Sequence, residues 1–260
     1  MNALKLNIAK TISKGNKLIN RNSPMKNGQR ILMYHSVRNF AKYEVSKNIY
    51  TLNPTLFIEQ MKCLKDNFDG CIRQLEFDDL HSQQELTINI TFDDGFKDNL
   101  KIVAPLMEEL KIPFTVFVAS DFLDQSHPLH LDKKELKELA AMSLVSIGSH
   151  SKSHANLTQL SKDQVKEELQ QSKLILEDLI GAEVCGFSYP FGGVNRDVRD
   201  SVEELGYKYA VNSCFDLNQK IEDRFMLSRN EIWNTDTSII FQEKIQGHWD
   251  WLKMNHKYKI

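Results

Sequence analysis

Short segments in which apolar and polar residues alternate recur along the chain, and between them lie longer segments with apolar residues at helical spacing. The short segments are rich in β-branched residues and predict strands at 30–37, 86–92, 114–118, 144–148, 184–189 and 207–211. The longer segments predict helices at 54–68, 99–111, 132–141, 161–180 and 198–205. This order is typical of parallel strands joined by helices, in a sheet or an incomplete barrel.

Local signals mark where some of these helices begin and end. Ser161 and Gln164 have the spacing of a capping box, and Gly181 follows the last apolar residue of the same helix. Pro105 interrupts the helix predicted at 99–111, because proline lacks the N–H that a helix interior needs. We therefore expect this helix to kink or to begin late.

The strand at 86–92 ends in two adjacent carboxylates, Asp93 and Asp94, followed by Gly95. Ligands gather at the carboxyl ends of parallel strands, because the loops there vary while the sheet holds them rigid. Successive strand residues point to opposite sides, so one aspartate could bind a cation while the other acts as a base. A simple Asp-Gly turn is the alternative interpretation of these residues.

His150 and His154 lie four residues apart, just after the strand at 144–148, and this spacing lets both imidazoles reach one cation. A polar loop without a metal is the alternative. With a carboxylate from another strand end, the two histidines would offer two nitrogens and one oxygen. This set suits a divalent metal, zinc first and nickel, cobalt or iron as alternatives, and it leaves a position for the water of a hydrolytic site.

Charge is distributed unevenly between the start of the chain and the rest. The first 30 residues hold seven Lys and Arg and no acid, which leaves 26 basic and 35 acidic residues, a net charge of −9, for the remainder. The remainder is therefore not a nucleic-acid binder by charge. Residues 4–21 place apolar residues near helical spacing among lysines, so residues 1–29 are either a basic tail or an amphipathic helix that contacts an anionic membrane.

The sequence also gives an expectation about the compartment. No apolar run of the signal-peptide kind follows the first lysines, and no segment reaches the length of a transmembrane helix. The four cysteines are scattered, as reduced thiols would be. We expect a cytoplasmic protein, peripheral to the inner face of the membrane if the basic segment binds lipid.

Three motifs resemble a known family. They are Thr-Phe-Asp-Asp-Gly at 91–95, His-Ser-Lys-Ser-His at 150–154 and Tyr-Pro-Phe-Gly at 189–192. In this order and spacing they resemble the first three motifs of the polysaccharide deacetylases, also called NodB-homology domains or carbohydrate esterase family 4. The resemblance runs from about residue 30 to residue 233. It implies an α/β fold, a distorted and incomplete (β/α) barrel of the NodB-homology type, with residues 30–260 as the catalytic domain.

The resemblance also implies a role for each motif residue. Asp93 would be the base, and the backbone N–H of Phe191 would line the oxyanion site. Three residues would bind the metal, namely Asp94, His150 and His154. Four residues would form the substrate-binding surface, namely Tyr189, Pro190, Phe191 and Arg229.

Two positions depart from the common pattern of the family. Ser188 stands where many members have an arginine that steadies the base, and Arg229 is the candidate for a replacement, although an ordinary surface arginine is the alternative. The usual C-terminal leucine-x-histidine motif is not recognisable, and His248 does not match it. The strand that ends at His35 resembles instead the permuted branch that includes poly-N-acetylglucosamine deacetylases. In that branch the histidine at this place is the acid.

The resulting hypothesis is a metal-dependent hydrolase that removes N-acetyl groups from a sugar of a cell-surface polysaccharide or its precursor. Its partner would be an N-acetylated glycan. An O-acetyl esterase and a catalytically silent glycan-binding domain are the alternatives. Four aromatic residues could stack on sugar rings, namely Phe191, Trp233, Trp249 and Trp251, and the tryptophans near the C-terminus could instead close a core or an interface.

Overall fold

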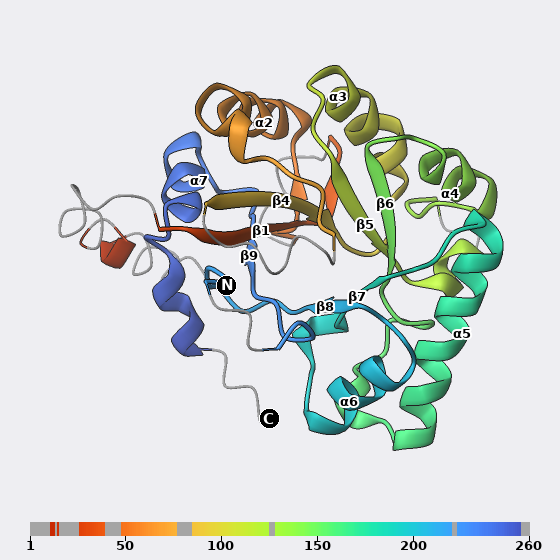
Figure 1. Cartoon of the computed structure of the whole chain (residues 1–260). Coiled ribbons are helices and arrows are strands. Elements are labelled where there is room, and N and C mark those ends of the chain that lie inside the picture. Colours follow the sequence, from red (N-terminus) through yellow and green to blue (C-terminus); the bar gives the residue numbers. More distant parts are fainter. Residues whose placement is uncertain are drawn as a thin grey trace.

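The strands of the molecule lie at its centre and the helices surround them, as the cartoon of this computed structural model shows (Figure 1). The structure describes residues 11–13, 15, 26–39, 48–76, 85–124, 128–219 and 223–255. One parallel sheet of seven strands has the order β8-β7-β6-β5-β4-β1-β9. Its strands are β1 (Gly28–Tyr34), β4 (Leu86–Phe92), β5 (Phe114–Val118), β6 (Val145–Ser149), β7 (Gly186–Ser188), β8 (Tyr209–Val211) and β9 (Arg229–Glu231).

The two edge strands of this sheet approach each other, so that the sheet curls into a nearly closed barrel. Val211, the last residue of β8, forms a parallel bridge with Leu227, which lies two residues before β9. The N–H of Asn212 donates to the Leu227 carbonyl at 2.8 Å, and the N–H of Leu227 donates to the Ala210 carbonyl at 3.0 Å. The prediction of an incomplete (β/α) barrel is thereby confirmed.

Six helices of the described part cover the outside of the barrel. They are α2 (Pro54–Phe68), α3 (Ala104–Glu109), α4 (Lys133–Ala140), α5 (Lys162–Ile180), α6 (Arg196–Glu204) and α7 (Ser238–Ile245). The predicted capping box of α5 is present, since Ser161 and Gln164 each bond to the other's backbone, and Gly181 ends the helix with φ of 70°. A short strand pair, β2 (Ser36–Val37) and β3 (Thr51–Leu52), lies outside the main sheet.

The late start that Pro105 predicted for the helix at 99–111 is confirmed, and the helix also ends two residues earlier than predicted, at Glu109. Residues Asn99–Val103 form one π-helical turn, and α3 itself begins only at Ala104, with Pro105 in its first turn. Proline is tolerated there because the first N–H groups of a helix have no intrahelical partner. The late start therefore places Pro105 where it breaks no hydrogen bond.

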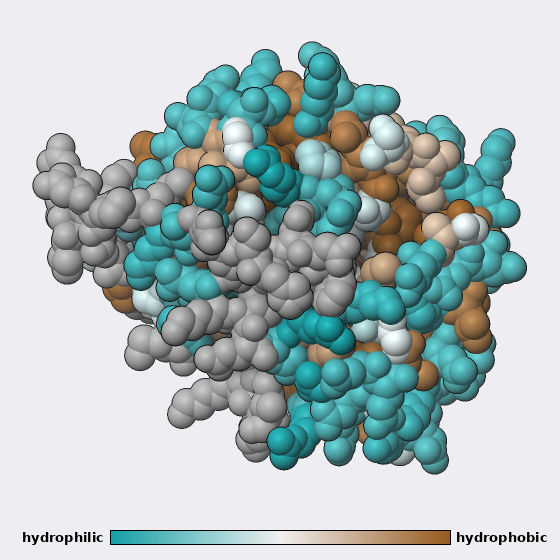
Figure 2. All heavy atoms as spheres, viewed as in Figure 1, coloured by the Kyte–Doolittle hydropathy of each residue, from teal (hydrophilic) through white to brown (hydrophobic). Residues whose placement is uncertain are grey.

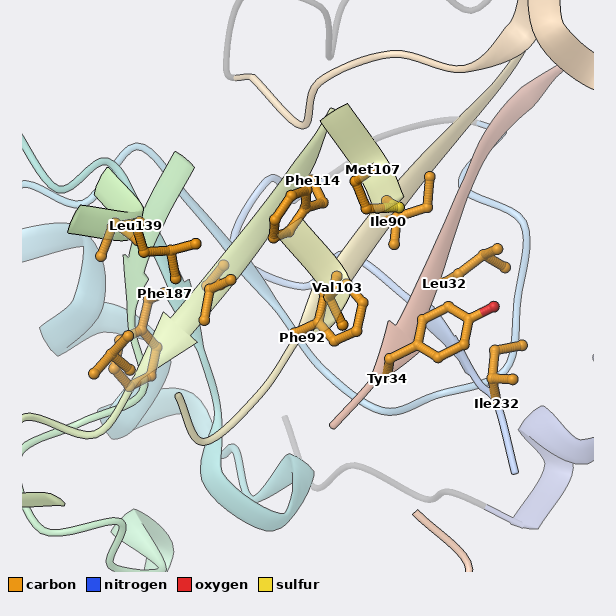
Figure 3. Close-up of a cluster of buried hydrophobic side chains, with 14 of the residues drawn as sticks. Leu32, Tyr34, Ile90, Phe92, Val103, Met107, Phe114, Leu139, Phe187 and Ile232 are labelled. Atoms are coloured by element: carbon orange, nitrogen blue, oxygen red, sulfur yellow. The ribbon is translucent and has the colours of Figure 1, made fainter. Parts of the chain in front are cut away.

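The two faces of the strands face different surroundings. Ile90 and Phe92 of β4 and Phe114 of β5 point outward, and they pack with Val103 and Met107 in the main hydrophobic core (Figure 3). The opposite face points into the barrel, where a smaller apolar cluster is formed by Ile31, Leu75, Phe117, Tyr209, Val211 and Leu227. Polar side chains occupy the rest of this interior.

Two further observations concern the start of the chain and the surface. The side chain of Ser13 is fully buried, and the indole N–H of Trp251 donates to its hydroxyl at 3.2 Å.

The face seen in Figure 2 is mostly hydrophilic, with smaller hydrophobic areas between the polar residues. Within the described residues, every helix is too short or too polar to cross a membrane.

Candidate active site

A cavity of about 350 Å³ opens at the carboxyl ends of the strands. Segments far apart in the sequence meet there because all seven strands run in the same direction. Most of the residues that the sequence singled out line this cavity, namely His35, Asp93, Asp94, His150, His154, Tyr189, Phe191 and Arg229. Pro190 is buried beside it and is not one of its lining residues.

Asp94, His150 and His154 form a cluster whose ligand atoms all lie within 4.8 Å of one another. Oδ1 of Asp94 is 3.4 Å from Nε2 of His150 and 3.2 Å from Nε2 of His154. The carboxylate follows β4 and the histidines follow β6, so the loops after two strands bring them together. Two imidazole nitrogens and one carboxylate oxygen at this spacing can hold a divalent transition metal.

The hydrogen bonds around this cluster fit a cation. Nδ1 of His150 lies 2.7 Å from the Ser188 carbonyl and can only donate to it, which leaves the Nε2 lone pair of this tautomer directed into the cluster. Oδ1 of Asp94 is buried, and no hydrogen-bond donor among the described residues is aligned with it. A buried carboxylate oxygen without a donor is costly, and a metal ion would satisfy it.

Asp93 forms a buried ion pair with Arg229. The guanidinium donates from Nη1 to Oδ1 and from Nη2 to Oδ2, both at 2.7 Å, and the exposed fractions of the two side chains are only 1% for Arg229 and 4% for Asp93. Burial raises the pKa of Asp93, but the charges of Arg229 and His150 outweigh this effect and bring the pKa below its usual value. Asp93 is therefore a carboxylate at neutral pH, held in one orientation.

Four residues around the cavity have a left-handed backbone conformation although they are not glycines. The φ angles are 73° for Asp94, 63° for Ser151, 60° for His154 and 58° for Phe191. This conformation is strained for residues with a Cβ, and such strain is concentrated at functional sites. The His154 N–H donates to the Ser151 hydroxyl at 3.0 Å, which helps to hold this turn.

His35 lies in the loop after β1, at the edge of the same cavity. Its carbonyl accepts a hydrogen bond of 3.0 Å from the side-chain amide of Asn99, and its ring centroid is 4.7 Å from that of Tyr50. Nδ1 is buried and has no hydrogen-bond partner among the described residues, which leaves Nε2 as the nitrogen that can face the cavity. His248, the other histidine considered, does not line the cavity.

The aromatic residues proposed for sugar stacking have different environments. The ring of Phe191 is 70% exposed at the cavity, and its centroid lies 4.7 Å from the ring of His154. Trp233 and Trp249 are buried in a hydrophobic cluster with Phe215, so they close a core and cannot stack on a ligand. Trp251 packs against the same cluster.

Several polar residues line the cavity although the sequence did not single them out, among them Asn48, Tyr50, Ser213 and Glu231. Glu231 lies two residues after Arg229 in β9 and therefore shares its face, but the sequence does not mark this segment as a strand. Tyr50 and Ser213 carry no signal either, since they lie in connections whose course the local pattern does not determine.

A sequence model described as polysaccharide deacetylase matches residues 81–210, which is half of the chain. The chain belongs to the polysaccharide deacetylase family. Among similar proteins, YxkH of Bacillus subtilis is 28% identical over 187 residues, and the match covers 70% of this chain and 63% of YxkH, less than two thirds of its length. The poly-β-1,6-N-acetyl-D-glucosamine N-deacetylase of Staphylococcus aureus is 26% identical over 206 residues, covering 70% of each chain.

The architecture is also that of a solved deacetylase. The Streptococcus pyogenes deacetylase PplD, in complex with acetate, superimposes with a TM-score of 0.75 at 22% identity, and the match covers 84% of this chain and 98% of PplD. At this identity the likeness concerns the fold alone. It agrees with the nearly closed parallel barrel and the surrounding helices described above.

Ser188 stands two residues before the proline of the third motif, at the position where many polysaccharide deacetylases have an arginine. The Ser188 hydroxyl lies 3.2 Å from Oδ2 of Asp93 and accepts a hydrogen bond of 2.9 Å from Nη2 of Arg229. Tyr189, the next residue, has a buried side chain whose hydroxyl donates to the Phe225 carbonyl at 3.0 Å. The small serine therefore leaves room for a guanidinium that comes from β9.

Proposed function

We propose that the chain is a metal-dependent polysaccharide deacetylase that hydrolyses the N-acetyl group of a sugar unit. The observation that carries the proposal is the Asp94–His150–His154 cluster beside the Asp93–Arg229 pair, with His35 in the same cavity. The likeness to the Staphylococcus aureus N-deacetylase supports an amide of an amino sugar as the bond that is cleaved.

In this proposal Asp94, His150 and His154 hold the metal. A divalent cation there supplies Lewis acidity, which polarises the acetyl carbonyl and acidifies water. Zinc is the expected occupant, and the same donors also accept nickel, cobalt and iron.

The other residues move or hold protons and charge. Asp93 accepts the proton of the attacking water, since its lowered pKa and its ion pair keep it ionised and oriented. The backbone N–H of Phe191 donates to the oxygen that becomes negative in the transition state. Nε2 of His35 protonates the sugar nitrogen as the bond to the acetyl carbon breaks, because an amine is a poor leaving group without a proton.

The division of labour between the two aspartates gives a direct test. Asp94→Ala, His150→Ala and His154→Ala each should lower the metal content of the purified protein, and Asp93→Asn should keep the metal and lose acetate release. Metal analysis and an acetate assay, each with and without a chelator, measure both quantities. Loss of the metal from Asp93→Asn would contradict the assignment, and full activity in chelator would contradict metal dependence.

A further inference from the structure

Glu231 places a carboxylate in the cavity that the proposed reaction does not use. It is the last residue of β9 and lines the cavity together with Tyr50. Its Oε2 accepts hydrogen bonds from the indole N–H of Trp233 at 3.0 Å and from the hydroxyl of Tyr50 at 3.5 Å. Both of these donors bond to Oε2, and no described residue donates a hydrogen bond to Oε1 of this cavity-lining side chain.

The strand geometry places this carboxylate near the reacting groups. Arg229 and Glu231 share the inner face of β9, and the side chain of Asn230 between them bonds to Arg30 on the outer face. Glu231 pairs with Met33 of β1, and His35 lies two residues further along. Strand spacing and rise put the Cα atoms of Glu231 and His35 about 8 Å apart.

No cation among the described residues lies within 4.0 Å of this carboxylate, and the charge of Lys244 acts on it only from farther away. The four hydrogen-bond partners of the Arg229 guanidinium are Thr91, Asp93, Ser188 and the Asn212 carbonyl. The Lys244 ammonium bonds to the carbonyl of Glu231 and is paired with Asp236. Both partners of Oε2 are neutral donors. Lys244 therefore faces two carboxylates, of which it pairs directly only with Asp236. A carboxylate at a partly enclosed site without a direct ion pair favours a cationic ligand, through a charge-assisted hydrogen bond.

The carboxylate is also held rigidly. Trp233, which donates to Oε2, is buried, and the Lys244 ammonium lies 3.6 Å from the centroid of its ring. Tyr50 packs against His35 on the other side, with ring centroids 4.7 Å apart. A fixed carboxylate loses little conformational freedom when a ligand binds, so its charge contributes to affinity with little opposing entropy.

We propose that Glu231, positioned by Tyr50 and Trp233, binds the ammonium group of a neighbouring sugar unit that is already deacetylated. The inference rests on the proposed function, because each deacetylation creates an amine, which takes up a proton in water. A chain with one free amine would then be a better substrate at the adjacent N-acetyl unit than a fully acetylated chain. Free amines would accumulate in contiguous stretches.

The test compares two oligosaccharides of equal length, one fully acetylated and one with a single free amine next to an acetylated unit. For the wild type, kcat/KM should be about tenfold higher on the second, and tenfold corresponds to about 1.4 kcal/mol. Glu231→Gln keeps an oxygen that can accept from Tyr50 and Trp233 but removes the charge, and it should bring the ratio close to one. A wild-type ratio of one, or an unchanged ratio in Glu231→Gln, would overturn the inference.

A matched control variant removes a glutamate charge at a position outside the cavity. Glu183 precedes β7 at the opposite end of the strands and pairs with Lys208 at 3.5 Å, so Glu183→Gln should keep the preference of the wild type. Equal loss of preference in both variants would mean that overall charge, and not Glu231, selects the amine. Circular dichroism checks that both variants are folded.

A binding measurement separates this inference from the proposed function. Full-length protein treated with a chelator is titrated with a glucosamine oligomer in a calorimeter, at low and high salt. Wild type should bind about tenfold more tightly than Glu231→Gln at low salt, with a smaller difference at high salt. If the oligomer binds in this way but acetate is never released from any sugar, the proposed function fails and the amine site stands. If acetate is released but the wild type and Glu231→Gln bind the oligomer equally well, the inference about the amine site is wrong and the proposed function stands.

Discussion

Replacing Arg229 with methionine should strongly destabilise the folded protein, because it leaves the buried Asp93 carboxylate without its counter-charge. Both side chains are almost completely buried and share two hydrogen bonds of 2.7 Å. Removing one partner of such a pair costs about 3–5 kcal/mol. At about 2–4 °C per kcal/mol for a chain of this size, the melting temperature should fall by roughly 6–20 °C.

A double-mutant cycle tests whether the cost comes from the pair itself. Arg229→Met, Asp93→Asn and the double variant are compared by urea and thermal unfolding. The double variant should be more stable than the sum of the two single effects predicts, by about 2 kcal/mol or more, since it contains no unpaired charge. Lys166→Met, which breaks the exposed Lys166–Glu204 pair, serves as the control and should change stability by less than about 1 kcal/mol. If Arg229→Met is no more costly than this control, the reasoning from burial is wrong.

Two other predictions concern the acid and the basic N-terminal segment. His35→Ala should lower activity on an amide substrate by about 10²–10⁴-fold, and by less on an aryl acetate, whose leaving group needs no proton. Acetate release measures both, and a selective defect in His248→Ala instead would transfer the role of acid to the C-terminal segment. Deleting residues 1–24 should reduce binding to anionic vesicles in a sedimentation assay, with a smaller difference at high salt. Equal binding by the two forms would exclude this segment as a membrane contact.

The sequence predicted well those parts of the site that depend on one strand and its neighbouring loop. The alternation in β4 turns Ile90 and Phe92 outward, so Thr91 and Asp93 must face the interior of the barrel. His150 and His154 lie in one loop, so their positions four residues apart were enough to predict that the two imidazoles lie close together. Because the strands are parallel, the aspartates after β4 and the histidines after β6 must lie at the same edge of the sheet.

The parts that could not be predicted depend on contacts between distant segments. β9 has only three residues, all polar, so neither hydrophobic alternation nor length marks it as a strand. Its place beside β1 is determined by backbone pairing that no local pattern records. The presence of Glu231 and Tyr50 in the cavity follows from that pairing, and for this reason only the complete fold shows it. The partnership of Arg229 with Asp93 was predicted only through the resemblance to the family, and backbone pairing of β9 explains how it forms.

The buried ion pair between Asp93 and Arg229 also affects the order in which parts of the site form during folding. The two residues are separated by 136 positions, and Arg229 belongs to the last strand of the sheet. Contacts of such large sequence separation form late, because the entropy of closing the intervening loop opposes them. A nascent chain emerges N-terminus first, so it contains Asp93 and the two histidines of the proposed metal site long before the arginine is synthesised. On the proposed function, hydrolytic activity would therefore arise only with barrel closure, and a chain truncated before β9 would contain the other parts of the site without an oriented base.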